Sequence, residues 1–404
     1  MAGISVKNSS DFFVGAFLWL KLVEFALFYF YLKIYAIRKF NFVGVLYALI
    51  LGGVFQAFIA IGQFLKQGDL GLRWLGESVL GPHMTGIASF YTSVGDKVIR
   101  AYGTTPHPNI LAAYLFLAIV AFYFVYIYHK NKRNEEEKTN YYDTLMNHSS
   151  GKLYDTMIYH IILKYWWMAV YPTLLFGLFF TFSRTIIFLW GAGFLTIIAT
   201  IAMSIRTGLK APVDNRHSMS VIHRLAALVL VTFVVVGAFS FLYWPEVQSR
   251  MTLSAEEEAV RLRVFYNEES LKGGINLFGI GLGDFTGWLV EQNPNLPSYM
   301  YQPVHNIYLL IYSEVGVVGF VLFLLFIGGL LYEFVKKVIH RPTLNVGYPQ
   351  GVLLVVASIL FIGLFDHFFL TLQQGRFVFW IALALLGALA PSLNKHKIES
   401  GGLT

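Results

Sequence analysis

Long apolar runs dominate this sequence and restrict what it can fold into. Several of them reach the roughly 20 residues that a helix needs to cross about 30 Å of hydrocarbon. Hydrophobic residues make up 56% of the chain and charged residues only 13%, a surplus that a soluble core does not require. Because every backbone polar group must be satisfied within the bilayer, such runs predict helices. The chain is therefore expected to be all-α, a polytopic bundle of transmembrane helices.

The apolar pattern predicts about nine spans in a single integral membrane domain, residues 1–404. The spans are expected at 12–36, 42–64, 109–128, 158–182, 185–205, 223–243, 306–332, 350–371 and 376–392. Two long loops separate them, at 65–108 and 244–305, and the second is expected to contain short helices.

Basic segments recur between alternate spans and predict the topology. They are Arg38-Lys39, 130–152, 206–224, Lys336-Lys337 and 395–397. By the positive-inside rule this side faces the cytoplasm. Both long loops of this multi-pass membrane protein are then extracytoplasmic.

Composition excludes several classes of site. The sequence contains no cysteine, which rules out disulfides, thiolate nucleophiles and cysteine zinc sites. The net charge of +7 is typical of cytoplasmic loops, and no nucleic-acid partner is predicted. His107, His305 and His367 are scattered and form no i, i+4 ligand pair, so neither a metal nor a cofactor is expected.

The first span contains two charged residues of opposite sign close together. Lys21 and Glu24 are one helical turn apart, so they are expected to pair, which lowers the cost of burying both. One interpretation is a helix packed inside the bundle around a neutralised pair. The other is a polar lining for a lipid headgroup.

The loop at 244–305 is the candidate catalytic element. Residues 255–272 have the spacing of an amphipathic helix. Leu277-Phe278-Gly279-Ile280-Gly281-Leu282-Gly283 follows, and its alternate glycines allow a tight turn and close approach to a neighbour. A phosphate-binding P-loop is disfavoured because no Lys-Ser/Thr pair follows the glycines. The run therefore predicts a structural turn that aims the loop at the membrane.

His305 and Asn306 lie where this loop enters an apolar span. An ionisable group beside a bilayer is costly and is a candidate for function, although a structural histidine is the alternative. Nearby arginines are expected to lower the pKa of His305 and keep its imidazole neutral, as a general base requires. Asn306 is expected to support it by hydrogen bonding. Glu314 is expected to line the cavity or hold a neighbouring helix.

Four arginines are candidates for phosphate binding, because guanidinium groups bind phosphate in a two-pronged manner and keep their charge. Arg184 and Arg376 occupy outward turns between spans, and Arg261 and Arg263 lie on the loop helix. The alternative is that Arg184 and Arg376 snorkel to the interface as span ends. Several arginines on the face that carries His305 favour a diphosphate site.

The first long loop ends in Pro106-His107-Pro108-Asn109. The prolines stiffen an extended approach, and Asn109 is expected to cap the next helix. A capping role and a functional role, in which His107 reaches the active cavity, both remain open.

Together, four motifs resemble the bacterial O-antigen ligase and polysaccharide polymerase superfamily. They are Gly103 to Ala112, Thr181-Phe182-Ser183-Arg184, the Arg261/Arg263 helix with its glycine turn, and His305-Asn306 with Glu314 to Gly319. Members are multi-span transferases that use undecaprenyl-diphosphate-linked glycans on the outer face of the plasma membrane. The resemblance implies His305 as the catalytic base and Arg184, with Arg261 or Arg263, as ligands of the diphosphate. The spacing to the glycine turn favours Arg261, whereas the Leu271-Lys272 pattern favours Arg263.

The predicted function is transfer of an oligosaccharide from that carrier to an acceptor hydroxyl, with inversion and without a metal. The acceptor is a glycan, a lipid or a protein, and membrane lipids are further partners. A protein O-oligosaccharyltransferase of the same superfamily and a flippase or exporter of lipid-linked glycan are the alternatives. Polar clusters on one face disfavour the flippase, and a non-enzymatic scaffold is least favoured.

Overall fold

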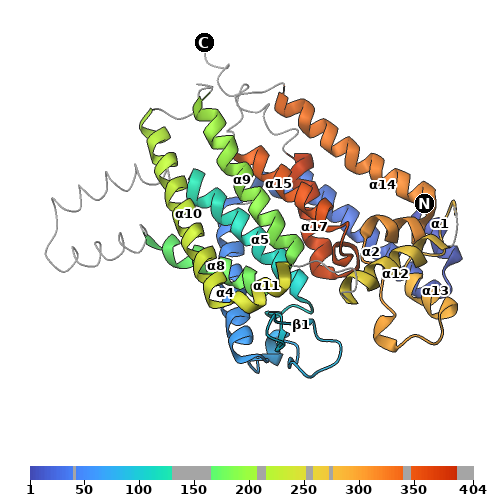
Figure 1. The fold of residues 1–404 in the computed structure, drawn as a ribbon. Helices are drawn as coiled ribbons and strands as arrows, with labels where there is room; N and C mark the ends of the chain where they lie inside the picture. Colours follow the sequence, from blue (N-terminus) through green and yellow to red (C-terminus); the bar gives the residue numbers. More distant parts are fainter. Residues whose placement is uncertain are drawn as a thin grey trace, which may run out of the picture. The chain divides into compact units, whose positions relative to one another are not determined.

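The structure is a computed structural model that describes residues 1–39, 42–129, 165–206, 215–251, 258–272, 276–339 and 347–388. Helices make up most of this part of the chain (Figure 1), and the expected all-α membrane fold is confirmed. Within the described residues, six helices are long and apolar enough to cross a membrane. They are Phe12–Ala36, Val43–Lys66, Pro108–Ile127, Arg184–Met203, Val221–Leu242 and Ile307–Lys336.

The remaining expected spans are shorter where they are described. The span expected at 158–182 is described as Trp167–Phe180, and the one at 376–392 as Gln373–Ala388. The helix expected to run from 350 to 371 ends at Ile362, and a short helix, Phe368–Thr371, follows. The basic segments 130–152 and 395–397 lie outside the described residues.

The chain divides into two compact units, which are described separately. The first comprises 1–40, 253–344 and 352–404, and the second comprises 41–252 and 345–351. Whether the two behave as the single domain expected from the sequence stays a prediction.

The first unit is built on helices that pack as α2 with α17 and α14 with both α12 and α17. Its elements are α1 (Ala2–Ser5), η1 (Val6–Asn8), α2 (Phe12–Tyr31), η2 (Leu32–Ala36), α3 (Ile37–Lys39), α12 (Glu258–Lys272), α13 (Phe285–Gln292), η5 (Ser298–Met300), α14 (Ile307–Ile339), most of α15 (Gly347–Ile362), α16 (Phe368–Thr371) and α17 (Gln373–Ala388).

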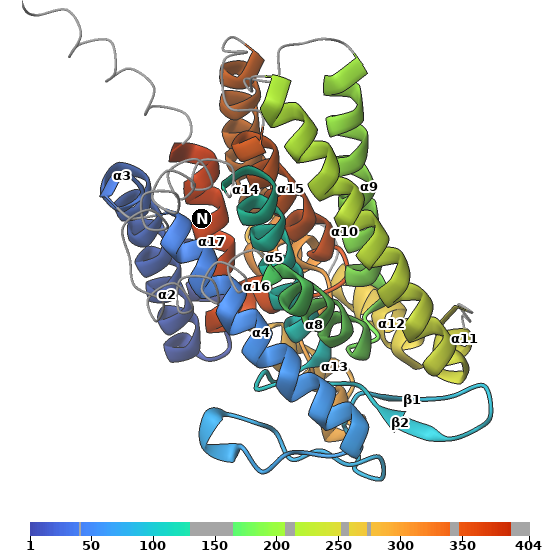
Figure 2. The same cartoon turned by 90° about the vertical axis from the view of Figure 1, so that its left-hand side faces the viewer.

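The second unit has a core of α4, α5 and α8, which pack together and lie side by side in both ribbon views (Figure 2). Its elements are α4 (Phe42–Lys66), η3 (Arg73–Leu75), β1 (Ser89–Tyr91), β2 (Lys97–Ile99), α5 (Pro108–Phe124), η4 (Val125–His129), α8 (Trp167–Phe180), α9 (Arg184–Arg206), α10 (Asn215–Leu242) and α11 (Trp244–Met251). The two strands form an antiparallel hairpin in the first long loop, with Phe90 opposite Val98.

A chain of buried hydrogen bonds joins four helices of this second unit. The Trp190 indole donates to the Tyr123 hydroxyl at 3.0 Å. That hydroxyl lies 2.8 Å from the Tyr171 hydroxyl, which lies 2.7 Å from the Thr232 hydroxyl. Each of these three hydroxyl groups therefore has a hydrogen-bond partner, as polar groups within a bilayer require.

A break in α14 holds the glycine turn of the large loop. Gly316 has φ 78° and ψ −179°, a conformation that only glycine adopts readily. The backbone groups that leave the helical ladder pair with the turn instead. Ile280 N–H donates to the Ser313 carbonyl at 2.9 Å, and Val317 N–H donates to the Asn276 carbonyl at 3.0 Å. The turn expected from the sequence thus fixes the loop to a membrane helix.

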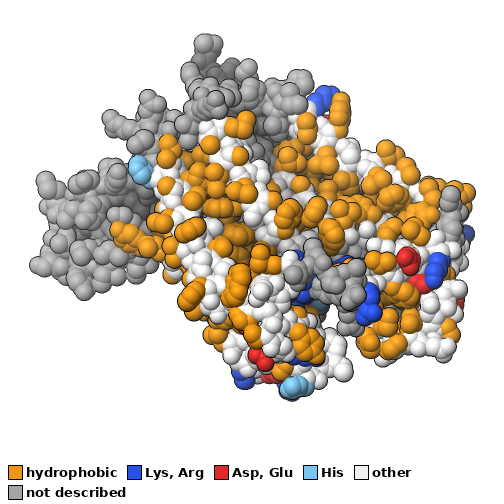
Figure 3. All heavy atoms as spheres, in the orientation of Figure 1, with side chains coloured by type: hydrophobic (Ala, Val, Ile, Leu, Met, Phe, Trp, Pro, Cys, Tyr) orange, Lys and Arg blue, Asp and Glu red, His pale blue; other side chains and the backbone are white. Residues whose placement is uncertain are grey.

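Hydrophobic side chains cover most of the helical surface in the space-filling view, where charged groups are few (Figure 3). Lys21 and Glu24 are an exception on α2. Their expected pairing is confirmed at 2.8 Å, but their side chains are 26% and 52% exposed. The pair therefore lies on the surface of the bundle, and the interpretation as a buried pair is wrong.

Candidate functional site

The first turn of α14 is fixed to the end of α15, and this positions His305. Ile307 N–H donates to the Gly363 carbonyl at 2.8 Å, and the Tyr308 hydroxyl donates to the Leu360 carbonyl at 2.9 Å. Asn306 caps the helix, because its side-chain oxygen accepts from the N–H groups of Tyr308 and Leu309. The side-chain amide of Asn306 is therefore used in capping the helix. His305 is the residue immediately before this cap.

His305 lies among four side chains from other segments of the first unit. Its ring centroid is 4.9 Å from that of His367 and 5.5 Å from that of Tyr266. The carboxyl of Asp366 and the guanidinium of Arg263 are close enough to affect its charge. The Nδ1 atom of His305 is buried and makes no hydrogen bond within the described part of the chain.

Burial is the main influence on this imidazole. It lowers the pKa of His305 to about 4, and the charges of His367 and Arg263 act in the same direction while Asp366 opposes them. Arginines were expected to cause this lowering of the pKa, whereas desolvation of the charged form is the larger cause. The neutral form that a general base requires is therefore the form present at neutral pH.

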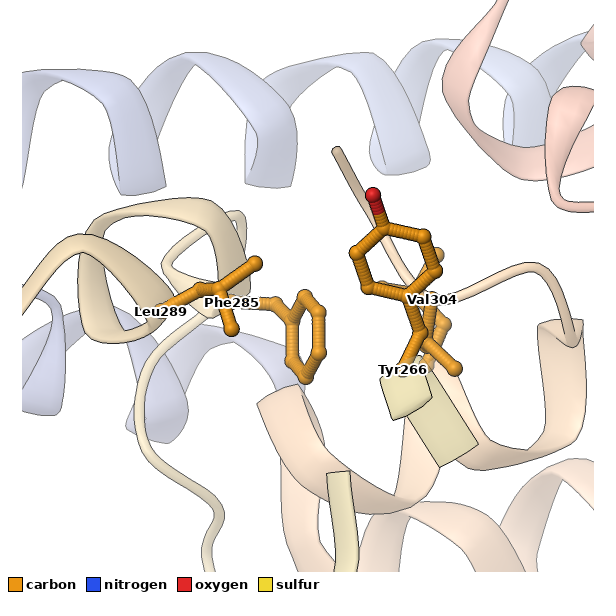
Figure 4. Packing of buried hydrophobic residues seen from close by; sticks show 5 residues of the cluster. Tyr266, Phe285, Leu289 and Val304 are labelled. Carbon is orange, nitrogen blue, oxygen red and sulfur yellow. The ribbon is translucent and has the colours of Figure 1, made fainter. Parts of the chain in front are cut away.

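Tyr266, on the loop helix α12, packs beside His305. Its hydroxyl donates to the Met300 carbonyl at 2.6 Å, and its ring is fully buried with Phe285, Leu289, Val304 and Leu310. Figure 4 shows Tyr266 of α12, Phe285 and Leu289 of α13, and Val304 of the segment that leads into α14 gathered together. Packing of this kind holds α12 against the segment that carries His305.

Asp366 and His367 complete a cluster that the sequence analysis did not foresee. Asp366 is buried, and its side chain accepts from the backbone N–H of His367 at 2.9 Å. His367 Nδ1 lies 2.7 Å from the Thr371 hydroxyl. Contrary to the expectation that the histidines are scattered, ligand atoms of His305, Asp366 and His367 lie within 4.8 Å of one another. Two nitrogens and one oxygen at this spacing could hold a metal ion.

The two arginines of α12 differ in environment. Arg263 is half-buried, affects the charge of His305, and donates through Nε to the Phe365 carbonyl at 3.4 Å. Arg261 is exposed; two residues along a helix place it about 200° away from Arg263. Of the two candidates, Arg263 is therefore the one beside His305.

Arg376 and Glu314 lie in the first unit, and both side chains form hydrogen bonds with backbone groups. Arg376 Nε donates to the Leu370 carbonyl, and its charge interacts with those of Glu314 and Glu24. The Glu314 carboxyl accepts hydrogen bonds from the backbone N–H groups of Gly283 and Phe285. Glu314 thus holds the end of the glycine turn, whereas the expected roles of lining the cavity or holding a neighbouring helix stay predictions. A role for Arg376 in phosphate binding stays a prediction.

In the second unit, Arg184 begins α9 after a strained turn. Phe182 has φ 46°, which is costly for a residue with a side chain, and such strain is common at functional sites. Arg184 Nε donates to the Arg250 carbonyl at 2.9 Å. Beside this turn, Arg100 donates to the Thr181 carbonyl and to the Asn109 side chain, both at 2.6 Å. The turn therefore gathers three guanidinium-bearing residues within one unit.

The start of α5 differs from the expectation. His107, not Asn109, is the N-cap: its Nδ1 accepts from the Asn109 N–H at 3.2 Å. The Asn109 side chain instead accepts from Arg100 and from the Ser183 hydroxyl. The prediction that Asn109 caps the helix is therefore wrong, and Asn109 joins the first loop to the Arg184 turn.

Sequence reasoning missed Asp366, Arg100, Arg250 and Tyr266 as members of these sites. A signal was available for Asp366, because a charged residue inside an expected span is unusual. No local pattern marked the other three, since long-range packing brings them into place.

Residues 169–324 match a protein-family model described as O-antigen ligase. The match runs from α8 into α14 and includes the Arg184 turn, both α12 arginines, the glycine turn and His305. No match to the chain was found among curated proteins. Residues 169–324 therefore support the O-antigen ligase and polysaccharide polymerase superfamily for this multi-pass membrane protein.

Proposed function

We propose that this protein is a glycosyltransferase that moves an oligosaccharide from an undecaprenyl-diphosphate carrier to an acceptor hydroxyl. One observation carries the proposal. The segment that matches the O-antigen ligase family contains a buried neutral imidazole, His305, with a carboxylate and a guanidinium as neighbours. The reaction would take place on the extracytoplasmic face of the bacterial inner membrane, the side to which the charge pattern assigns both long loops.

In the proposed step, the acceptor oxygen attacks the anomeric carbon of the carrier-linked sugar. The acceptor O–H bond breaks, and its proton passes to His305. The bond between the anomeric carbon and the diphosphate oxygen breaks, and undecaprenyl diphosphate leaves with the electron pair. Attack from the face opposite the leaving group inverts the anomeric configuration. A positioned base of this kind contributes roughly 10²–10⁴-fold to the rate.

Positive charge is needed where the diphosphate departs. Arg263 supplies it beside His305, and Arg261 is the alternative ligand on the same helix. A role for Arg184 in binding the diphosphate stays a prediction from the family resemblance. Preorganised donors at a developing negative charge contribute about 3–4 kcal/mol each. The step needs no metal, because guanidinium groups provide both the charge and the two-pronged geometry.

The carrier itself would strengthen the base. A group with a pKa of about 4 is a weak proton acceptor, and an anion bound nearby raises the pKa of an imidazole. The bound diphosphate would therefore make His305 more basic at the moment when the acceptor must lose its proton.

Three classes of acceptor fit the proposed step. A glycan, a lipid or a protein hydroxyl would all meet His305 in the same way. A protein O-oligosaccharyltransferase of the same superfamily differs from a ligase or polymerase in this acceptor alone, so the product must distinguish them.

The test is mass analysis of the product that the purified protein makes in proteoliposomes from a defined undecaprenyl-diphosphate oligosaccharide. A new glycosidic bond is expected, and His305→Ala should lower its formation by roughly 10²–10⁴-fold. His83→Ala is the matched control, because His83 is an exposed histidine of the first long loop. Movement of the carrier across the bilayer without a new glycosidic bond would instead identify a flippase. Normal transfer by His305→Ala would show that His305 is not the catalytic base.

A further inference from the structure

The cluster of His305, Asp366 and His367 has the composition of a metal site. Each residue offers one ligand atom, and the three atoms lie within 4.8 Å of one another. Two segments far apart in sequence supply them, and hydrogen bonds between α14 and the end of α15 hold those segments together. Two imidazole nitrogens with one carboxylate oxygen suit divalent transition metals better than Mg²⁺ or Ca²⁺.

His305 provides a second, independent observation. Its Nδ1 atom is buried and has no hydrogen-bond partner within the described residues. A buried polar atom without a partner typically costs about 1–3 kcal/mol. Coordination of a cation would satisfy this atom, and the buried carboxylate of Asp366 would offset part of the charge of the ion.

His367 is oriented as metal-binding histidines usually are. Its Nδ1 is 2.7 Å from the Thr371 hydroxyl, which leaves Nε2 as the nitrogen available to an ion. A hydrogen bond from the second ring nitrogen to a neighbouring oxygen is the usual way in which a protein fixes such a ligand. Thr371 therefore orients His367 without itself binding the ion.

One group opposes the ion. The positive charge of Arg263 acts on His305, so it would weaken the binding of any cation there. The cluster is therefore suited to reversible occupation by a metal, rather than to a permanent structural metal.

We propose that His305, Asp366 and His367 bind one divalent transition-metal ion of the Zn²⁺ class, and that this ion inhibits glycan transfer by occupying the imidazole of His305. The inhibitory part rests on the proposed function, whereas the binding part does not. An imidazole nitrogen that coordinates an ion has no lone pair left for a proton.

Binding is tested first, without any glycan. The full-length protein is purified in detergent, stripped with a chelator and titrated with ZnSO₄ by calorimetry. One site is expected that MgSO₄ does not fill. His367→Ala and Asp366→Asn should each abolish it or weaken it by more than about tenfold, and Thr371→Val should weaken it about 10–100-fold. His83→Ala should leave it unchanged.

Folding is controlled within the same experiment. Zn²⁺ should raise the melting temperature of the wild-type protein and of Thr371→Ser, which keeps the hydroxyl, but not that of His367→Ala. Absence of zinc binding, or zinc binding that survives His367→Ala and Asp366→Asn in folded protein, would overturn the site.

Inhibition is tested second, in the transfer assay. Zn²⁺ should inhibit, and Thr371→Val should raise the half-inhibitory concentration by the factor by which it weakens zinc binding. Transfer that continues at saturating Zn²⁺ would overturn the inhibitory part and leave the transferase proposal standing. Zinc binding by a protein that forms no glycosidic bond would support the site and count against the transferase.

Discussion

Gly279 and Gly316 pack backbone against backbone. A Cβ atom on Gly316 would overlap the Gly279 nitrogen and the Leu277 carbonyl, and a Cβ atom on Gly279 would overlap the Glu314 carbonyl. Both residues also have positive φ angles. The contact between the large loop and α14 thus depends on the absence of two side chains.

Gly316→Ala should destabilise the protein. Backbone strain at its φ of 78° costs about 1–3 kcal/mol, and overpacking adds about 1–3 kcal/mol. Thermal unfolding in detergent measures the loss. Gly328→Ala is the control, because nothing lies within 4 Å of its added methyl group, and a helical glycine replaced by alanine gains about 0.5–1 kcal/mol. Equal stability of the two variants would show that the turn does not need the break in α14.

Arg263→Lys should lower glycan transfer by about 10²–10³-fold, because an ammonium group cannot reproduce the guanidinium fork beside His305. Arg261→Lys is the matched control on the exposed side of α12, and its activity should change little. Rates measured with a defined lipid-linked oligosaccharide distinguish the two. The opposite ranking would assign the diphosphate ligand to Arg261, as the spacing to the glycine turn suggested.

Asn306→Ala should cost about 0.5–2 kcal/mol of stability, because two N–H groups at the start of α14 lose their acceptor. Asn306→Ser retains a capping oxygen and should recover most of that loss. Melting temperatures of the two variants provide the comparison. If Asn306 contacts substrate instead, the serine variant would be stable yet as inactive as the alanine variant.

His107→Ala should cost a similar amount, about 0.5–2 kcal/mol, through loss of the α5 cap. His107→Asn supplies another good capping side chain and should restore stability. Transfer activity then decides the second role that the sequence left open. Full activity of His107→Asn limits His107 to capping, and low activity in a stable protein would show that the imidazole acts in catalysis.

Local sequence signals predicted six of the nine expected spans well. The helices Phe12–Ala36 and Val43–Lys66 begin and end within two residues of the expected bounds, because hydrophobicity over about 20 residues is a strong and local signal. The kink at Gly316 was not predicted, because an apolar helix tolerates an isolated glycine and the partner that requires it lies far away in the sequence.

The candidate site was less predictable. Pro108 favours the first helical position and so pointed to His107 as the cap, a signal that the interpretation of Asn109 overlooked. Asp366 and His367 lay inside an expected span, and only the end of α15 at Ile362 places them beside His305. Such neighbours arise from tertiary packing, which periodicity does not report.

The hydroxyl chain from Trp190 through Tyr123 and Tyr171 to Thr232 has a mechanical consequence. Each of α5, α8, α9 and α10 contributes one member of the chain. In hydrocarbon no solvent molecule can replace a lost partner, so sliding one helix past the next would leave polar groups on both helices without hydrogen bonds. These four helices should therefore respond to a ligand as a stiff block, and shear among them should be suppressed.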